Sequence, residues 1–293
     1  MINASIRIIA PAKVNLNLLV TNKLDNGFHG LESDLCFVNL YDEILIQRSS
    51  YNKIIIDHKN STQFLKEDTL LKKTLKIFNT EFNNKNFFKI TLKKNIPVGA
   101  GLGGGSADSA ALLLGLRYFY NNDKYNNSKI SIKKLKKISI QIGSDVPACI
   151  SSNSQRLEGI GDKLKKIKIP KNYMLLIIFP NVSLSTQTVF KTYDDLKNRI
   201  LNVNYFEKIK IFNSLLIPAQ KLEPKIKETL KKLNSFKKII ASGMTGSGSS
   251  CFGIFKNEED FTSQKAYNDL KKEDDFFIWY GNKKEFGYNR ILL

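Results

Sequence analysis

Five glycines occur within the seven positions from Gly99 to Gly105, and this cluster constrains the fold more than any other part of the sequence. Residues 87–94 alternate apolar and polar side chains and predict a strand, whereas residues 106–119 are almost continuously apolar and predict a buried helix. Glycine lets the loop between them adopt positive φ and approach a ligand, and backbone N–H groups at a helix start attract anions. We therefore predict a phosphate-binding loop made of Pro97, Val98, Gly99, Ala100, Gly101, Leu102, Gly103, Gly104, Gly105, Ser106 and Ala107.

Alternative interpretations of this loop are weaker. A Walker A loop requires lysine where this chain has Gly105. Gly99, Gly101 and Gly104 match G-x-G-x-x-G, but a dinucleotide site also needs an acidic residue closing the next strand about 20 residues on. The candidate, Asp123, lies in a polar stretch instead. A purely structural turn would carry five glycines at roughly 0.5–1 kcal/mol of backbone entropy each. Phosphate binding is therefore favoured.

Two polar side chains, Ser106 and Asp108, stand where the predicted helix begins. They are expected either to order a phosphate-bound Mg²⁺ or to cap the helix, and both alternatives remain open. At Gly104 we expect a β-branched side chain to abolish nucleotide binding, because it disfavours positive φ and fills the space of the phosphates.

The net charge of +19 suggests nucleic-acid binding at first sight, but its distribution argues against it. Almost all of the positive charge is lysine spread along the chain, and only six residues are arginine, which is the side chain that grips phosphate bidentately. We therefore expect no nucleic-acid partner. The basic field would still attract an anionic substrate.

The compartment is predicted from the cysteines and the apolar runs. Cys36, Cys149 and Cys251 are odd in number, far apart and without metal-ligand spacing, which is typical of a reducing compartment. No apolar run approaches the ~18 residues of a membrane span. We expect a cytoplasmic protein with no membrane contact, and the sequence leaves its oligomeric state and metal ligands open.

The chain divides into two expected domains, residues 1–165 and 166–293, at a lysine-rich stretch. In the second half, strands are expected at 173–179, 238–241, 251–255 and 276–280, with helices at 186–198, 224–234 and 258–271. Apart from one extra helix, this is the β-α-β-β-α-β order of a ferredoxin-like domain.

Together with two further segments, the loop resembles the galactokinase–homoserine kinase–mevalonate kinase–phosphomevalonate kinase superfamily. The segments are 11–16 (PAKVNL) and 242–252 (SGMTGSGSSCF). The resemblance spans nearly the whole chain. It implies an α+β two-domain small-molecule kinase fold, with an N-terminal ribosomal-protein-like α/β domain, a C-terminal ferredoxin-like domain and the active site between them. It also implies ATP and Mg²⁺ as cofactors and an alcohol group as phosphoryl acceptor.

The same resemblance implies the catalytic residues. Asp145, within the segment 143–147 (GSDVP), is implied as the catalytic carboxylate that receives the acceptor proton. Lys13 is implied to keep this carboxylate ionised and to stabilise a developing alkoxide. From the residues alone, Asp145 is better explained as a helix-start residue and Lys13 as a solvent-facing strand lysine; the resemblance favours the catalytic roles.

A narrower likeness concerns the acceptor. Segments 27–29 (GFH), 158–161 (EGIG) and 180–190 point to family members that act on the cytidyl diphosphate of a branched polyol, in isoprenoid precursor biosynthesis. Phe28 and Phe190 would then stack on the cytosine and His29 would bind its edge, with Asn15 and Thr186 as polar neighbours. The family commonly has tyrosine where this chain has Phe28, so one hydrogen bond is lost.

Two other functions compete at this point. Another kinase of the superfamily, of the homoserine or mevalonate type, is disfavoured because a small acyclic acceptor needs no base-stacking pair. An RNA-binding module is suggested by the charge and the ribosomal-protein-like first domain, but it has no use for the two further glycine motifs.

Overall fold

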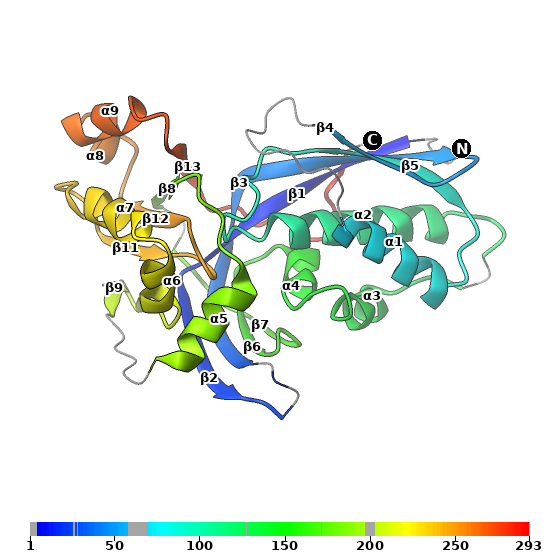
Figure 1. The fold of residues 1–293 in the computed structure, drawn as a ribbon. Helices are drawn as coiled ribbons and strands as arrows, with labels where there is room; N and C mark the ends of the chain where they lie inside the picture. Colours follow the sequence, from blue (N-terminus) through cyan, green and yellow to red (C-terminus); the bar gives the residue numbers. More distant parts are fainter. Residues whose placement is uncertain are drawn as a thin grey trace.

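The computed structural model describes residues 5–25, 27, 29–57, 69–126, 128–170, 172–196 and 203–292 of the 293-residue chain. One expected site residue, Phe28, lies outside these ranges. Two lobes are visible in Figure 1, one with a large sheet over helices α1 to α4 and one with a smaller sheet accompanied by helices α5 to α9.

The large sheet is organised around one very long strand, β3 (His29–Ser49), which pairs with β1, β2, β5 and β6. The other strands of this sheet are β1 (Ser5–Asn15), β2 (Asn17–Lys23), β4 (Lys53–Asp57), β5 (Phe87–Lys93), β6 (Gln155–Gly159), β7 (Lys163–Lys166), β9 (Asn204–Phe206), β10 (Ile209–Asn213) and β14 (Ile291–Leu292). Apolar residues alternate along β1, so that Ile6, Ile8 and Ala10 point into the core.

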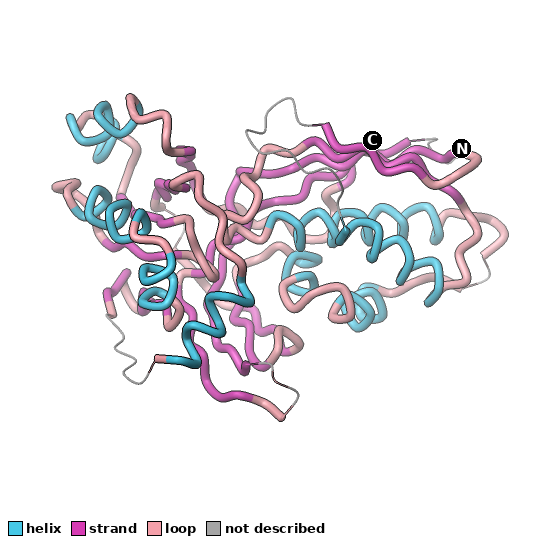
Figure 2. The backbone as a smooth tube through the Cα atoms, viewed as in Figure 1, coloured by secondary structure: helices cyan, strands magenta, loops and turns pink. Residues whose placement is uncertain are grey.

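Four helices pack against one face of this sheet, as Figure 2 shows. They are α1 (Thr69–Glu81), α2 (Gly104–Asn121), α3 (Ile132–Ser139) and α4 (Val146–Ser151). Helix α2 is the central one: it contacts β1, α1 and α4, and it is apolar on nearly all sides because it is buried among them. Its N-terminus points toward the second lobe (Figure 1).

The second lobe contains a four-stranded antiparallel sheet in the order β11-β12-β8-β13. Its strands are β8 (Met174–Phe179), β11 (Ala241–Met244), β12 (Cys251–Phe255) and β13 (Phe277–Asn282), and its helices are α5 (Thr186–Asp195), α6 (Leu216–Leu222), α7 (Lys225–Asn234), α8 (Glu259–Thr262) and α9 (Lys265–Lys271). If the four strands are numbered in chain order, they lie in the sheet in the order second, third, first, fourth. The second strand is at one edge and the fourth is at the other. The expected ferredoxin-like topology is therefore confirmed.

Two strands that come late in the chain pair with strands of the first lobe. Strand β10 pairs in parallel with β2 of the first sheet, and β14 pairs with β1. The last strand of the first sheet before the second lobe, β7, ends at Lys166, and β8 begins at Met174. A single division at residue 165 therefore remains a prediction, since later residues return to the first sheet.

Some element boundaries differ from the sequence predictions. The strand expected at 238–241 is β11, three residues later, and the helix expected at 186–198 is described as far as Asp195. The helix expected at 258–271 is two short helices, α8 and α9. Thr262 and Ser263 donate side-chain hydrogen bonds back to the carbonyls of Glu258 and Glu259, and Gln264 is extended. Such side-chain bonds compete with helix continuation.

Candidate active site

A cavity of about 460 Å³ lies where the two lobes meet. Its described lining includes residues 97–106 of the glycine loop, Lys13, Asp145, the turn 246–248 and Phe190. Ala107, the last residue of the predicted loop, is fully buried behind it. The structure thus brings the three sequence motifs to one place, as predicted.

The glycine loop owes its shape to positions with positive φ. Gly101 (φ 75°) lies so close to the second lobe that a Cβ atom on it would be 2.6 Å from the carbonyl oxygens of Thr245 and Gly248. Gly103 (φ 67°) is the N-cap of α2, and a Cβ there would be 2.6 Å from Cγ of Lys13. The expectation of positive φ at Gly104 is wrong, because Gly104 is the first residue of the helix.

The first turn of α2 borders the cavity. The first hydrogen bond of the helix runs from the N–H of Ala107 to the carbonyl of Gly103, at 2.9 Å. The N–H groups before it have no partner within the helix, and they carry the positive end of the dipole of an 18-residue helix. Residues 104–106 line the cavity, so this end of the helix fits a phosphate group.

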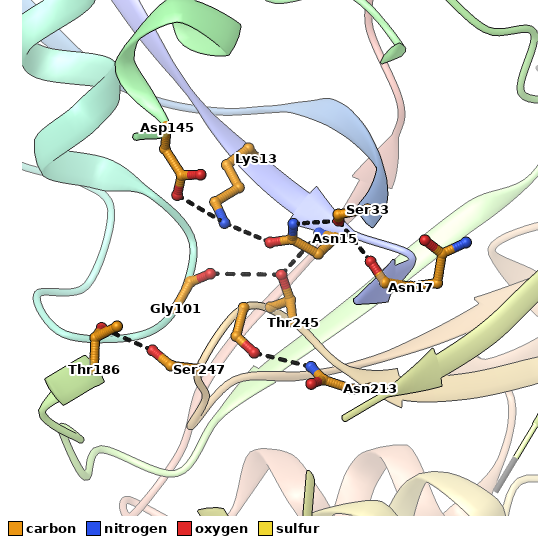
Figure 3. Close-up of polar contacts among 11 residues, drawn as sticks. Lys13, Asn15, Asn17, Ser33, Gly101, Asp145, Thr186, Asn213, Thr245 and Ser247 are labelled. Atoms are coloured by element: carbon orange, nitrogen blue, oxygen red, sulfur yellow. Dashed lines mark hydrogen bonds and ion pairs between the residues drawn. The ribbon is translucent and has the colours of Figure 1, made fainter. Parts of the chain in front are cut away.

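Lys13 and Asp145 form an ion pair in this cavity, with Nζ 3.1 Å from Oδ2 (Figure 3). The Lys13 side chain is 6% exposed and that of Asp145 is 31% exposed. Lys13 follows a register irregularity in the pairing of β1 with β3, and its N–H donates to the carbonyl of Leu102 in the glycine loop, at 2.9 Å. It is therefore not the solvent-facing strand lysine that its sequence context allowed.

Asp145 is the N-cap residue of α4, but its carboxylate makes no capping hydrogen bond to the helix. The backbone carbonyl serves the helix instead, by accepting from the N–H of Cys149 at 3.1 Å. The residue thus begins the helix through its backbone while its side chain stays directed at Lys13.

A polar network around Asn15 fixes the lysine and links the lobes (Figure 3). Lys13 Nζ donates to Asn15 Oδ1, and Asn15 Nδ2 donates to Ser33 Oγ at 2.7 Å. The N–H of Asn15 donates to Oγ1 of Thr245 in the second lobe, at 2.9 Å. Asn213 Nδ2 donates to the carbonyl of Gly246 at 2.8 Å and so supports the turn that contacts the glycine loop. The chain just after this turn also contacts the loop directly, since the N–H of Ser250 donates to the carbonyl of Ala100 at 3.1 Å.

Sequence reasoning missed Ser33, Thr245 and Asn213. Thr245 lies inside the quoted segment 242–252 and was detectable there. The other two carry no local signal, because their partners are far away in the sequence.

A second buried cation lies beneath the loop. Lys94 Nζ contacts Asp42 Oδ2 at 2.5 Å and Asp108 Oδ2 at 2.9 Å, and both carboxylates are fully buried. Burial opposes the charged form of Lys94, but the Asp108 and Asp42 carboxylates raise its pKa above the ordinary value. The expectation that Asp108 orders Mg²⁺ or caps α2 is wrong, because its side chain faces inward to Lys94 and Gly103 occupies the cap position.

The residues expected to bind the acceptor are split between two hollows. Asn15, Thr186 and Phe190 line the large cavity, and Thr186 Oγ1 is 2.9 Å from Ser247 Oγ. His29 lines a neighbouring hollow of about 270 Å³, and its ring stacks on Phe190 with centroids 4.9 Å apart.

The imidazole of His29 is held in place by Asp194 on α5. His29 Nε2 is 2.7 Å from Asp194 Oδ1, and Lys23 Nζ is 2.6 Å from Asp194 Oδ2. The hydrogen bond from Lys23 has the largest effect on the pKa of Asp194 and lowers it. Burial opposes this effect and the hydrogen bond from His29 adds to it, so the pKa lies below its ordinary value.

The described residues contain neither a side-chain cluster for a metal ion nor a membrane-spanning helix. In these ranges no cluster of three or more His, Cys, Asp or Glu side chains is arranged to hold a metal ion. No helix in the same part of the chain combines the length and apolar character needed to span a bilayer.

Comparison with known proteins agrees with this geometry. The model of the GHMP kinases N terminal domain matches residues 69–153, and that of the GHMP kinases C terminal domain matches residues 199–272. The chain therefore belongs to the GHMP kinases, the family of ATP-dependent small-molecule kinases that the resemblance of the three motifs implied.

Among its relatives are two proteins named 4-diphosphocytidyl-2-C-methyl-D-erythritol kinase. The one from Clostridioides difficile strain 630 is 33% identical and the alignment covers 87% of this chain and 88% of the relative; the one from Clostridium novyi strain NT is 34% identical, covering 92% and 97%. A crystal structure of 4-(cytidine 5'-diphospho)-2C-methyl-D-erythritol kinase superposes with a TM-score of 0.72 at 24% identity, covering 94% of this chain and 98% of that one. Homoserine kinase from Cytophaga hutchinsonii shares the fold, with a TM-score of 0.66 at 16% identity and coverages of 100% and 98%.

Proposed function

We propose that this protein phosphorylates the 2-hydroxyl of 4-diphosphocytidyl-2-C-methyl-D-erythritol with ATP, a step of non-mevalonate isoprenoid precursor biosynthesis. The observation that supports phosphoryl transfer is the Lys13–Asp145 ion pair, which lines the same cavity as the glycine loop. The acceptor is supported by the names of the relatives, which align over most of both chains.

In this proposal Asp145 orients the acceptor hydroxyl and receives its proton. Lys13 pairs with this carboxylate and stabilises negative charge on the attacking oxygen. The acceptor is a tertiary alcohol, which is weakly acidic and crowded. Alignment of the hydroxyl by fixed groups therefore contributes more than proton removal alone.

The N–H groups of the glycine loop and of the first turn of α2 bind the phosphates of ATP. Asp145 is the carboxylate among the described lining residues, and Ser106 adds a hydroxyl. This small donor set fits an Mg²⁺ ion that arrives on the phosphates and keeps most of its waters. When bound, the ion would neutralise phosphate charge, and the hydroxyl of Ser106 at the first turn of α2 would be among the groups that meet it.

The acceptor would enter past Phe190, with its base on the face of that ring which borders the cavity. Thr186 and Asn15 are proposed as polar contacts farther in, and His29 as the residue next to the base edge. Phe28 is proposed on resemblance alone. A cytoplasmic location suits three unpaired cysteines that are buried, two of which, Cys36 and Cys149, have a pKa raised by burial to about 12.

The deciding experiment is ATP turnover with a panel of acceptors: the cytidyl diphosphate, its uridyl analogue, homoserine and mevalonate. We expect turnover with the cytidyl compound at a kcat/KM at least about 100-fold above the others, because a hydrogen-bonded base edge discriminates strongly. Preference for homoserine or mevalonate would replace the proposed acceptor by that of another branch of the family. If the protein turns over none of these acceptors and binds RNA with a steep salt dependence, the assignment as a kinase is overturned.

A further inference from the structure

Arg290 is a buried arginine that lies far along the sequence from Lys13 and Asp145, the ion pair in the cavity. It is 2% exposed and lies just before β14, in a segment, residues 283–292, that returns to the first lobe and that we name the return segment. Its guanidinium donates to Ser152 Oγ at 2.6 Å and to the carbonyls of Cys149 and Ile150 at 2.9 and 3.3 Å. These two carbonyls belong to the last turn of α4, which has no partners for them within the helix.

The counter-charge of Arg290 is unusual. In the described part of the chain its partners are a hydroxyl and two backbone carbonyls, and its Nε has no hydrogen-bond partner. A buried charge without a carboxylate is costly, so the negative end of the α4 dipole has to compensate it. Burial lowers the pKa of Arg290 to about 10, which still leaves the guanidinium charged at neutral pH.

Helix α4 connects this guanidinium to the cavity. The N–H of Cys149 donates to the carbonyl of Asp145, and the carbonyl of Cys149 accepts from Arg290. Cys149 therefore joins Asp145 to Arg290 through its two backbone hydrogen bonds. The helix between them, α4, is only about 9 Å long. A helix this short has little stability of its own, so its position depends on what holds its ends.

The same return segment also holds β1, which carries Lys13. The N–H of Ile9 donates to the carbonyl of Arg290 at 3.4 Å, and Ile8 pairs with Ile291. Arg290 thus contacts the strand of the lysine through its backbone and the helix of the aspartate through its side chain.

We propose that Arg290 is a positioning residue for phosphoryl transfer, which clamps α4 to β1 and so keeps Asp145 within ion-pair distance of Lys13. This inference rests on the proposed role of Asp145. It predicts that loss of the guanidinium lowers turnover without weakening nucleotide binding, because the glycine loop has its own supports in Lys94 and in the turn 245–248.

The test compares kcat, KM for ATP and ATP affinity by calorimetry in the full-length wild type and in Arg290→Met, Asp145→Asn and the double variant. We expect Arg290→Met to lower kcat roughly 10- to 100-fold, as a misplacement of about 1 Å would do, with ATP affinity unchanged. Arg290→Lys should recover part of the loss, because an ammonium can still reach one carbonyl. In the Asp145→Asn background, Arg290→Met should lower kcat by less than about threefold, because residues that act as a unit are not additive.

Glu285→Gln is the matched control. Glu285 anchors the same segment by accepting from the N–H of Ser154 at 2.9 Å, beyond the end of α4. This variant should lose thermal stability but keep the wild-type kcat. If Arg290→Met does not fold, Arg290→Gln, which retains one donor group, replaces it with the same expected pattern.

Wild-type kcat in folded Arg290→Met beside an inactive Asp145→Asn would overturn this inference alone. The same fold loss from Arg290→Met in both backgrounds would also overturn it, because Arg290 would then act independently of Asp145. Wild-type kcat in Asp145→Asn would instead overturn the catalytic assignment on which the inference rests.

Discussion

The ring of His29 lies against one face of Phe190, with the two planes inclined by 24°. Because the two rings are in contact, a base cannot enter between them. Phe190 also lines the large cavity, so a base entering from there would stack on the part of this ring that His29 leaves uncovered. With His29 Nε2 bonded to Asp194, any contact of the imidazole with a base has to use the other ring nitrogen.

Phe190→Ala should therefore weaken acceptor binding and leave ATP binding nearly unchanged. Stacking of a base on an aromatic ring contributes ~1–3 kcal/mol, so the KM for the acceptor should rise roughly 5- to 150-fold. Phe190→Tyr keeps the ring and should stay near wild type. His29→Ala should reduce the preference for the cytidyl over the uridyl acceptor. A rise in the KM for ATP instead would place these rings on the adenine side.

Asp145→Asn should keep the fold and the ATP affinity but lose turnover by about 10²- to 10⁴-fold, because the amide cannot accept the acceptor proton. Single-turnover kinetics and calorimetry on the same sample separate the two effects. Asp269→Asn is the control, since Asp269 is an exposed carboxylate on α9, in the other lobe. Equal activity of the two variants would contradict the role of Asp145.

Gly101→Ala should weaken ATP binding at least tenfold and lower the melting temperature, because the new Cβ would lie 2.6 Å from two backbone carbonyl oxygens. Gly287→Ala controls for backbone strain. Gly287 also has positive φ, at 65°, but a Cβ there meets nothing within 4 Å. It should cost about 1 kcal/mol of stability and leave the calorimetric ATP affinity unchanged. Unchanged ATP affinity in Gly101→Ala would show that the loop tolerates a wider approach to the second lobe.

Lys94→Met should destabilise the protein by about 3–5 kcal/mol, because it leaves Asp42 and Asp108 buried without a cation. The neighbouring Lys93 is 43% exposed in its side chain and pairs with Glu43 at 3.4 Å. Lys93→Met should change stability by less than about 0.5 kcal/mol. Urea unfolding of both variants checks the difference, and equal midpoints would mean that the two carboxylates take up protons instead.

The stabilising effect of Asp194 should depend on pH. Its pKa is lower in the folded protein than in the unfolded chain, so its contribution is present above the unfolded value of 3.8 and is lost as pH falls through the folded value. The melting temperature of Asp194→Asn should therefore lie below that of the wild type at pH 6–7. The difference should shrink in strongly acidic buffer, and a difference that persists unchanged there would contradict the assigned cause.

The features that local sequence could predict are those with local causes. The glycine loop, the buried helix behind it and the ferredoxin-like order follow from residue type and periodicity, and each was found. Asp145 illustrates the limit: residues around it predict a helix start, which is correct for its backbone, but only the fold shows that its carboxylate faces Lys13.

Asp108 shows why the rest escaped prediction. Next to a phosphate loop, a carboxylate at a helix start suggests a metal ligand or a cap, and only the position of Lys94 and Asp42 shows that it faces the core. Asn15 and Thr245 are likewise brought together by the packing of two lobes, and their separation of 230 residues leaves no periodic trace. Such pairings depend on topology, which local propensity does not encode.

The pairing of β1 with β14 has a consequence for synthesis. Arg7 and Leu292 are register partners, so this contact has one of the largest sequence separations that the fold contains. Contacts of such high order form slowly, because a long loop must close before they add stability. On the ribosome, the glycine loop and Lys94 are made in the first half of synthesis, and the turn 245–248 that supports the loop follows later. The pairing of β1 with β14 and the contacts of α4 with Arg290 wait until residues 290–292 emerge. The nucleotide site would thus be assembled before the reactive pair is fixed in position.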